Sequence, residues 1–237
     1  MHAFDNGDML IRDEVLEAHP RRPGPVRKHI ADYYGIITHV DEQIGRILDA
    51  LDETGQRDNT IVVFAGDNGL AVGQHGLMGK QNLYEHSARV PLIMSGPGIP
   101  ANQRSDTLCY LLDIYPTLCE LTGIQAPETV EGKSLVPAFD DQSTHIRDVV
   151  HLAYKGYQRG VRDYRHKLIE YAVDGERHTQ LFDIQTDPHE MNNLADDPSM
   201  EAVLGKLRRR LREWQTDLDD NQEMGREFWQ TYNGGIR

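Results

Sequence analysis

Cysteine is scarce in this 237-residue chain, where Cys109 and Cys119 are the only two. Both fall within residues 106–122, a segment whose apolar spacing predicts helix. Ten helical residues separate two Cα atoms by roughly 15 Å, whereas a disulfide tolerates at most about 7 Å. We therefore expect two free, buried thiols and a fold that does not depend on disulfides.

Long apolar runs are also absent. No run approaches the roughly 20 residues that a membrane-spanning helix needs. The first ten residues are neither basic nor continuously apolar, so no signal peptide is visible. The sequence therefore predicts no membrane span and does not indicate a compartment.

Basic residues are outnumbered: 25 Lys and Arg stand against 38 Asp and Glu, which gives a net charge of −13. Phosphate backbones and anionic membranes attract clustered cations, so we expect no nucleic-acid partner. A long polysulfated ligand would need locally positive subsites. The length allows one or two domains with a sizeable core.

The most informative stretch covers residues 60–94. It opens with an apolar, β-branched run, Thr60–Ala65, which predicts a strand covered on both faces. The run stops at Gly-Asp-Asn-Gly, residues 66–69, where two glycines flank two oxygen-bearing side chains. Open α/β sheets bind ligands at the carboxyl ends of their strands. We therefore expect a site at this end of the strand.

Four polar side chains in this stretch indicate a chemistry. Asp67 and Asn68 offer adjacent oxygen ligands of the kind that Ca²⁺ prefers, although a shell of about six to eight ligands needs more. Lys80 is a point charge suited to a tetrahedral anion, and His75 could donate a hydrogen bond or move a proton near neutral pH. A divalent metal, a lysine and a histidine suit transfer of a sulfuryl or phosphoryl group, in which charge develops on peripheral oxygens.

Each of these residues also has a simpler interpretation. Asp-Asn-Gly is usually a turn, and a second copy, Asp5-Asn6-Gly7, has no apolar strand before it, so we interpret that copy as a plain turn. His75 could be an ordinary loop residue, and Lys80 could simply be solvated. The tripeptide by itself therefore does not identify a metal site.

The order of the motifs is more specific. The run at 60–69 is followed by Gly-Gln-His-Gly at 73–76, Gly-Lys at 79–80, Tyr-Glu at 84–85 and Arg-Val-Pro-Leu-Ile at 89–93. This order resembles the second half of formylglycine-dependent sulfatases, a family of the alkaline-phosphatase-like superfamily. The resemblance implies that Asp67 and Asn68 are the family's second pair of metal ligands, for one Ca²⁺. It also implies that Lys80 contacts the sulfate group, and it makes His75, in the Gly-x-His-Gly segment, a second catalytic candidate.

The family's first half has no counterpart in the chain. Neither cysteine begins the Cys-x-Pro-x-Arg motif that sulfatases convert to formylglycine, and nothing matches the first pair of metal-binding aspartates. The resemblance therefore implies the C-terminal portion of a longer enzyme, inactive by itself because the nucleophile is missing. Members of the family are often periplasmic, secreted or lysosomal, and the implied substrate is a sulfated small molecule or glycan.

The first predicted part, residues 1–142, is an α/β portion. Apolar residues at spacings of three and four predict a helix from Val26 to Leu51, which Gly55 would end. A helix that leads into the strand at 61–65 favours a parallel neighbour. With a helix pair at 106–122, restarted near Pro116, this pattern agrees with the α/β/α sandwich that the resemblance implies.

The second predicted part, residues 143–237, is a C-terminal α+β subdomain. Short apolar runs separated by the turn signals Lys155-Gly156 and Asp174-Gly175 predict a small antiparallel sheet. A stripe within residues 200–218 predicts a closing helix that buries its apolar side chains, Leu207, Leu211 and Trp214. The last twenty residues receive no assignment.

Three polar motifs in this second part have a structural interpretation. Arg162 and Lys167 fall where the family has a Val-Arg … Tyr-Lys hairpin. His189 with Glu190 is interpreted as a turn and helix cap rather than a metal site. Arg-Arg-Arg at 208–210 is interpreted as a solvated face rather than a polyanion site.

Three functions remain open from the sequence. Sulfate ester hydrolysis follows from the resemblance. A phosphoesterase or phosphonate monoester hydrolase of the same superfamily would use a similar metal pair, although Asn68 in place of a histidine fits a single Ca²⁺ better. A non-catalytic remnant retained for binding is the third.

Overall fold

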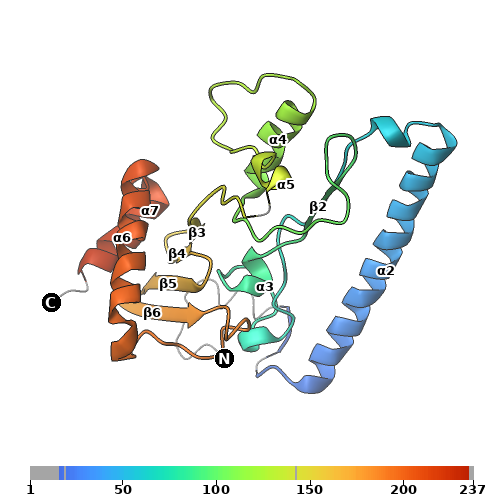
Figure 1. Ribbon diagram of the computed structural model, residues 1–237. Coiled ribbons are helices and arrows are strands. Elements are labelled where there is room, and N and C mark those ends of the chain that lie inside the picture. The colour runs from blue at the N-terminus through green and yellow to red at the C-terminus, as the bar shows by residue number, and fades with distance from the viewer. Residues whose placement is uncertain (1–15, 19, 142, 235–237) are drawn as a thin grey trace. The chain divides into compact units, whose positions relative to one another are not determined.

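The computed structural model describes residues 16–18, 20–141 and 143–234 (Figure 1). The chain packs into two compact units. Among the described residues, unit 1 holds residues 16–18, 20–21, 68–89 and 148–234, and unit 2 holds residues 22–67, 90–141 and 143–147. The predicted turn at Asp5-Asn6-Gly7 lies outside the described residues. The predicted boundary at 142/143 stays a prediction about the family's domains, because the packing places residues 68–89 with the C-terminal part.

Unit 1 is built on a four-stranded antiparallel sheet. Its strands are β3 (Val150–Tyr154), β4 (Gln158–Arg162), β5 (His166–Val173) and β6 (Glu176–Asp183), and they pair in sequence order. Residues 174 and 175 connect β5 to β6, and both have positive φ, 51° and 82°, as a two-residue hairpin of the Asp-Gly type requires. The predicted antiparallel sheet and its turns are confirmed.

Two helices cover one face of this sheet. A 3₁₀ turn, η4 (Pro198–Met200), leads into α6 (Glu201–Asp217), and α7 (Glu223–Gly234) follows (Figure 1). The core of this layer is apolar and includes Leu168, Leu181, Leu207, Leu211 and Phe228, each 0% exposed. The closing helix is therefore confirmed, with Trp214 half-buried at its edge. Helix α7, which the sequence analysis did not assign, completes the layer.

Residues 68–89 cover the opposite face. Successive side chains of a strand point to opposite faces, so Ile169 and Tyr171 of β5 turn away from α6. They pack with Leu77, Leu83 and Tyr84 of the 68–89 segment. This segment contains a 3₁₀ turn, η2 (Gln74–Gly76), and a short helix, α3 (Glu85–Ala88). The segment with the candidate residues therefore forms an outer layer of unit 1.

The described residues of unit 2 form a pair of strands and five helical elements. The strands are β1 (Val62–Ala65) and β2 (Leu92–Ser95), and the helical elements are α2 (Pro23–Glu53), η1 (Arg57–Asn59), η3 (Leu111–Asp113), α4 (Ile114–Leu121) and α5 (Pro137–Asp140). Helix α4 starts two residues before Pro116, as expected for a proline in a first turn. The predicted free thiols are confirmed, Cys119 buried and Cys109 half-buried.

The predicted parallel neighbour of the first strand is wrong for the described residues. β1 and β2 are antiparallel, with Val62 opposite Ser95 and Ala65 opposite Leu92. A parallel pair needs a crossover connection, whereas residues 66–91 turn the chain back. The strand is also not covered on both faces by the described residues, because Phe64 is 41% exposed.

Helix α2 confirms the predicted helix and its stop, but it begins at Pro23, three residues before the predicted start at Val26. Proline stands in its first turn, and Gly55 has the positive φ, 66°, of a helix C-terminal glycine. None of its residues is buried, and Tyr34 and Ile47 are 65% and 64% exposed. Its apolar stripe is thus not covered by the described part of unit 2.

No helix among the described residues is long and apolar enough to cross a membrane.

Candidate functional site

The 68–89 segment folds back on itself and brings its two ends together. Three backbone hydrogen bonds join its arms: the N–H groups of Ala71, Val72 and Gly73 donate to the carbonyls of Gly79, Met78 and Leu77, over N···O distances of 3.0, 3.3 and 2.7 Å. Asn68 precedes the first arm and Lys80 follows the second, so both lie at the open end of this loop. Both side chains are exposed. The loop therefore has an exposed amide side chain before its first arm and an exposed ammonium group after its second.

The backbone after Asn68 lies against helix α3. The Gly69 N–H donates to the carbonyl of Ser87 over 3.0 Å. A Cβ at position 69 would stand only 1.9 Å from the His86 carbonyl oxygen, so no residue with a side chain fits there without backbone movement. The second glycine of Gly-Asp-Asn-Gly is thus required by a close approach of two backbone segments.

Asp67 follows the carboxyl end of β1 by two residues, as the sequence predicts, and its side chain is exposed. It is the last residue of its segment in unit 2, whereas Asn68 and Lys80 belong to unit 1. The convergence of Asp67 with Lys80 stays a prediction. Asp67 and Asn68 are hard oxygen donors that suit Ca²⁺. They form a partial set, because the described residues contain no group of three or more His, Cys, Asp or Glu side chains able to hold a metal.

His75 makes contacts that a structural role explains. Its ring stacks on Tyr84 with centroids 3.9 Å apart and planes 3° apart. Its Nε2 lies 3.1 Å from the carbonyl oxygen of His189, and since a carbonyl only accepts, Nε2 carries the proton. Burial lowers the pKa of His75, so the ring is neutral at neutral pH. The loop tip is thereby held to the turn that contains His189, and a catalytic role for His75 stays a prediction.

A polar cavity of about 520 Å³ adjoins His75 within unit 1. Its wall includes Tyr84, His178, Gln180 and Glu190. Burial raises the pKa of Tyr84 to about 12, and its hydroxyl donates to Gln180 Oε1 over 3.0 Å. Tyr84 is therefore a protonated, hydrogen-bonded wall of this cavity and a platform for the histidine ring.

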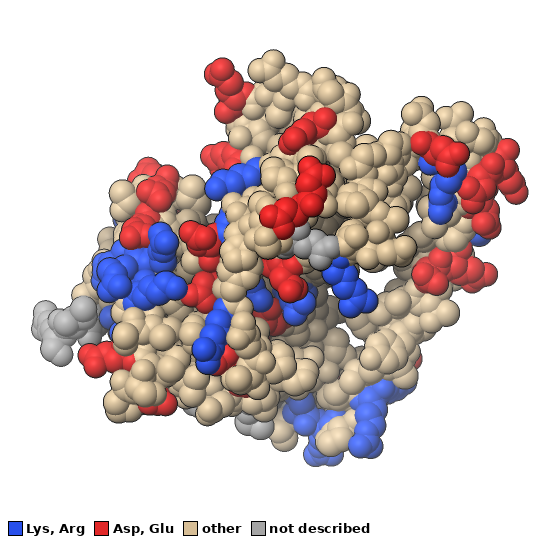
Figure 2. Space-filling model, in the orientation of Figure 1, with Lys and Arg blue, Asp and Glu red and all other residues tan. Residues whose placement is uncertain are grey.

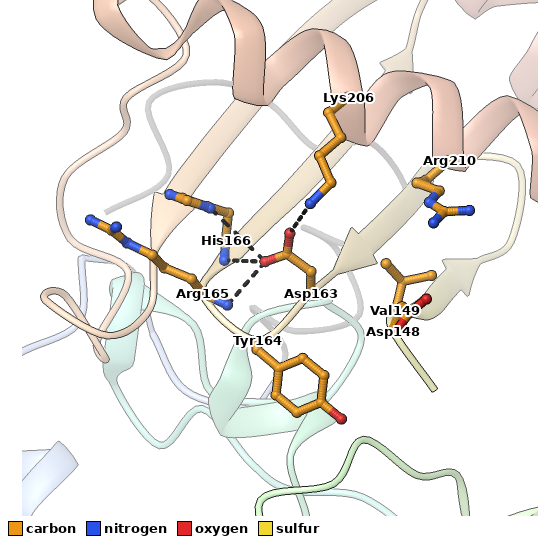
Figure 3. Close-up of a pocket in the computed structure, with 8 residues that line it drawn as sticks. All are labelled: Asp148, Val149, Asp163, Tyr164, Arg165, His166, Lys206 and Arg210. Atoms are coloured by element: carbon orange, nitrogen blue, oxygen red, sulfur yellow. Dashed lines mark hydrogen bonds and ion pairs between the residues drawn. The ribbon is translucent and has the colours of Figure 1, made fainter. Parts of the chain in front are cut away.

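A second hollow of about 480 Å³ lies between α6 and the loop from β4 to β5 (Figure 3). Lys206 and Arg210 approach it from α6, and Arg165 from the loop (Figure 3). Each of these cations has a carboxylate partner, namely Asp163 at 3.0 Å from Lys206, Glu213 at 3.2 Å from Arg210 and Asp183 at 2.8 Å from Arg165. Because the carboxylates neutralise the charges of these cations, the hollow is a weaker candidate for an anion site than Lys80.

The basic run at 208–210 is only in part a solvated face. Basic side chains gather over α6 beside acidic ones (Figure 2). Arg208 is 35% exposed at its side chain, and its Nε lies 2.7 Å from Oε1 of the buried Glu170. The prediction was wrong for Arg208, because the partner lies on β5, 38 residues away in sequence.

An ion network beneath the loop was not predicted. Buried Lys167 of β5 contacts the carboxylates of Glu85 and Glu190. The turn and cap predicted at His189-Glu190 is confirmed in a different form, because Glu190 caps α3 rather than a helix next to it in sequence. A lysine inside the apolar run of β5 is the sequence signal that could have indicated this network, since buried lysines need partners.

Two families of known proteins match the chain over residues 6–217. The family described as "Sulfatase" matches residues 6–124, and "N-sulphoglucosamine sulphohydrolase, C-terminal" matches residues 73–217. An N-acetylglucosamine-6-O-sulfatase of Bacteroides thetaiotaomicron is 31% identical over 207 residues, which cover 82% of this chain and 37% of the relative.

Solved structures agree with these matches. A structure described as a complex with its substrate D-glucosamine-2-N,6-O-disulfate superposes with a TM-score of 0.78 at 28% identity, over 88% of this chain and 45% of that chain. A phosphonate monoester hydrolase from Silicibacter pomeroyi gives 0.73 at 28% identity, over 81% and 42%. The chain thus spans less than half the length of these relatives.

These matches confirm the predicted α/β class and the alkaline-phosphatase-like fold. The two family matches together cover residues 6–217, and they overlap over residues 73–124, which include His75 and Lys80. The chain belongs to the sulfatase family.

Proposed function

We propose that the complete protein hydrolyses sulfate esters, and that this chain supplies one half of the active site. The observation that supports the proposal is the joined loop of unit 1, with Asn68 before its first arm and Lys80 after its second arm, in a part of the chain that the description "Sulfatase" matches. Asp67 and Asn68 would hold one Ca²⁺, which when bound would polarise the oxygens of the sulfate.

Lys80 has the main chemical role in this proposal. Its ammonium group would face the sulfate and offset the negative charge that develops on the peripheral oxygens. A lysine carries three donors on a flexible stem, so it can follow a tetrahedral group as its geometry changes. The firm backbone of the loop limits where that stem begins.

The chain by itself is proposed to be inactive. Covalent catalysis needs an activated nucleophile, which the family forms as formylglycine, and neither Cys109 nor Cys119 begins the required motif. The two proposed metal ligands also fill only part of a calcium shell. The remaining ligands and the nucleophile would come from a part of the enzyme that this chain does not contain.

The proposed substrate is a sulfated small molecule or glycan. The names of two relatives support this class, one an N-acetylglucosamine-6-O-sulfatase and the other solved with D-glucosamine-2-N,6-O-disulfate. Phosphonate monoester hydrolysis is the second candidate, because a hydrolase of that kind shares the fold at 28% identity. Asn68 at the second ligand position favours a single Ca²⁺ and therefore the sulfatase.

The test is hydrolysis of 4-methylumbelliferyl sulfate by the complete gene product and by the 237-residue chain. We expect turnover only from the complete product, and a decrease of about 10²- to 10³-fold for Lys80→Ala, as for loss of a group that stabilises transition-state charge. Asp67→Ala should also remove most turnover. The exposed residues Lys133 and Asp106 provide matched alanine controls that should retain activity.

Two outcomes would contradict this proposal. Turnover by the 237-residue chain alone would show that its nucleophile lies within the chain. A complete product that cleaves a phosphonate monoester and not the sulfate ester would favour the second candidate.

A further inference from the structure

Three sequence motifs that the proposed chemistry does not use meet in unit 1. They are Tyr-Glu at 84–85, the hairpin at 162–167 and the turn at 187–190. Lys167 Nζ lies 3.1 Å from Glu85 Oε1 and 2.9 Å from Glu190 Oε1, and Arg162 Nε lies 3.2 Å from the same Glu85 oxygen. We call these four side chains, Glu85, Arg162, Lys167 and Glu190, the Lys167 clasp.

The clasp is buried and electrically balanced. The side chains of Lys167 and Glu190 are 0% and 2% exposed, and those of Glu85 and Arg162 are 10% and 18% exposed. Two cations face two carboxylates, so the group carries no net charge. Removing one member would leave an unpaired charge away from water, which is strongly unfavourable. The four groups therefore fix one another's positions.

The clasp is bonded directly to helix α3. Glu190 Oε2 accepts the backbone N–H of Glu85, the first residue of α3, over 2.6 Å. The N-cap residue of this helix makes no side-chain capping bond, so Glu190 satisfies an N–H that a helix start leaves free. Glu190 has φ of +55°, a conformation that residues other than glycine adopt rarely. Such conformations persist where the surroundings hold them, as Lys167 does here.

Backbone contacts connect α3 to the segment that carries Asn68 and Lys80. Gly69 donates to Ser87 of α3 and fits so closely that no Cβ is possible, which places Asn68 at the edge of the helix. Beyond Gly69, the bonds from Ala71 to Gly79 set the backbone at Lys80. The neighbouring His189 carbonyl holds His75 at the loop tip. The turn at 187–190 therefore contacts both the tip of the loop, through His75, and helix α3, through Glu85.

We infer that the Lys167 clasp is a positioning device for the candidate site: it fixes the loop that presents Asn68 and Lys80. The role of those two residues rests on the proposed function, whereas the ordering of the loop by the clasp does not. Apolar contacts of Leu77, Leu83 and Tyr84 also hold the loop to the sheet. Loss of the clasp should thus loosen the α3 end of the loop without unfolding unit 1.

The test compares Lys167→Met with Arg159→Met in the 237-residue chain by hydrogen exchange. Arg159 is a matched control, since its side chain is 2% exposed and its Nε lies 2.6 Å from Asp220, away from the loop. In Lys167→Met, the amides of residues 69–73 and 85–89 should exchange at least about tenfold faster. In Arg159→Met they should exchange as in the wild type.

A sulfate titration followed through the amide resonance of Lys80 supplies a second readout. The wild type and Arg159→Met should show the same saturable shift, and Lys167→Met should lose it. No response in the wild type would count against the proposed role of Lys80, and the exchange comparison would still decide the role of the clasp. Equal exchange of residues 69–73 in the two methionine variants would overturn the inference.

A conservative pair of variants covers the case in which Lys167→Met does not fold. Glu190→Gln keeps an oxygen that can accept the Glu85 N–H, whereas Glu190→Ala removes it. Protection of the loop should decrease from wild type to Glu190→Gln to Glu190→Ala. Equal protection of residues 85–89 in all three proteins would also overturn the inference.

Discussion

Gly69→Ala is the most direct test of how the loop is held against α3. The added Cβ would meet the His86 carbonyl oxygen at 1.9 Å and its carbon at 2.9 Å. Both atoms belong to the backbone, so no rotamer change can relieve the clash, and either α3 or the arm of the loop must move. The bond from the Gly69 N–H to Ser87 would be strained or lost with that movement.

Overpacking a well-packed protein interior typically lowers the free energy of unfolding by about 1–3 kcal/mol, and we expect a loss of this size for Gly69→Ala. For a chain of this length, 1 kcal/mol lowers Tm by about 2–4 °C, so Gly69→Ala should lower Tm by roughly 2–12 °C. Gly205→Ala is the matched control, because position 205 is inside α6 and its Cβ would meet only a flexible arginine nitrogen at 3.8 Å. Alanine is favoured over glycine in a helix by about 0.5–1 kcal/mol, so this variant should raise Tm.

Thermal unfolding followed by circular dichroism measures both changes, and hydrogen exchange locates them. Faster exchange in Gly69→Ala should concentrate in residues 69–73 and 85–89. An unchanged Tm together with unchanged exchange in these residues would refute the close approach of the two backbone segments. A destabilised Gly205→Ala would show that the reasoning about added methyl groups fails for this protein.

Further predictions concern the cores of the two units and the response to pH. Leu211→Ala, at a fully buried position of α6, should cost about 2–5 kcal/mol in urea unfolding, whereas Leu218→Ala, 56% exposed, should cost little. Arg147 contacts the carboxylate of the fully buried Asp113 at 2.5 and 2.6 Å, so Arg147→Met should lower the free energy of unfolding by about 3–5 kcal/mol. A loss smaller than that measured when a solvent-exposed ion pair is broken would contradict this prediction. Burial lowers the pKa of His151 below the ordinary value of 6.5, so its contribution to stability is present above pH 6.5 and is lost as the pH falls through the folded-state pKa. His151→Gln should therefore flatten the decline of stability below pH 6.5, and an unchanged slope would contradict this assignment.

Local signals in the sequence predicted much of the secondary structure. The helix at 23–53, the Asp174-Gly175 hairpin and the stripe of α6 each depend on residues close together in the chain. Their periodicity or turn chemistry is set locally, so the sequence contains the required information. The motif order at 60–94 likewise identified the family, which the comparisons confirm.

The errors concern partners that lie far apart in sequence. The direction of β2 depends on the route of residues 66–91, and the apolar pattern of a strand does not encode that route. Lys167 meets a carboxylate 82 residues away, and polarity along the chain does not identify such a partner. Helix α7 was missed because its apolar pattern is short and its apolar side chains are buried only by contact with the sheet and α6. Tyr232 of α7, for example, packs under Arg177 of β6, whose Cζ lies 3.8 Å from the centre of the tyrosine ring.

The central claim is that Asp67, Asn68 and Lys80 face one sulfate and one Ca²⁺ in the complete protein. A crystal structure of the complete gene product with Ca²⁺ and sulfate measures this directly. We predict that the oxygens of Asp67 and Asn68 lie within about 2.3–2.6 Å of the ion and that the Lys80 amine contacts the sulfate. Since ligand contacts with calcium are that short, a separation of more than about 10 Å between the Asp67 carboxylate and the Lys80 amine would contradict the claim.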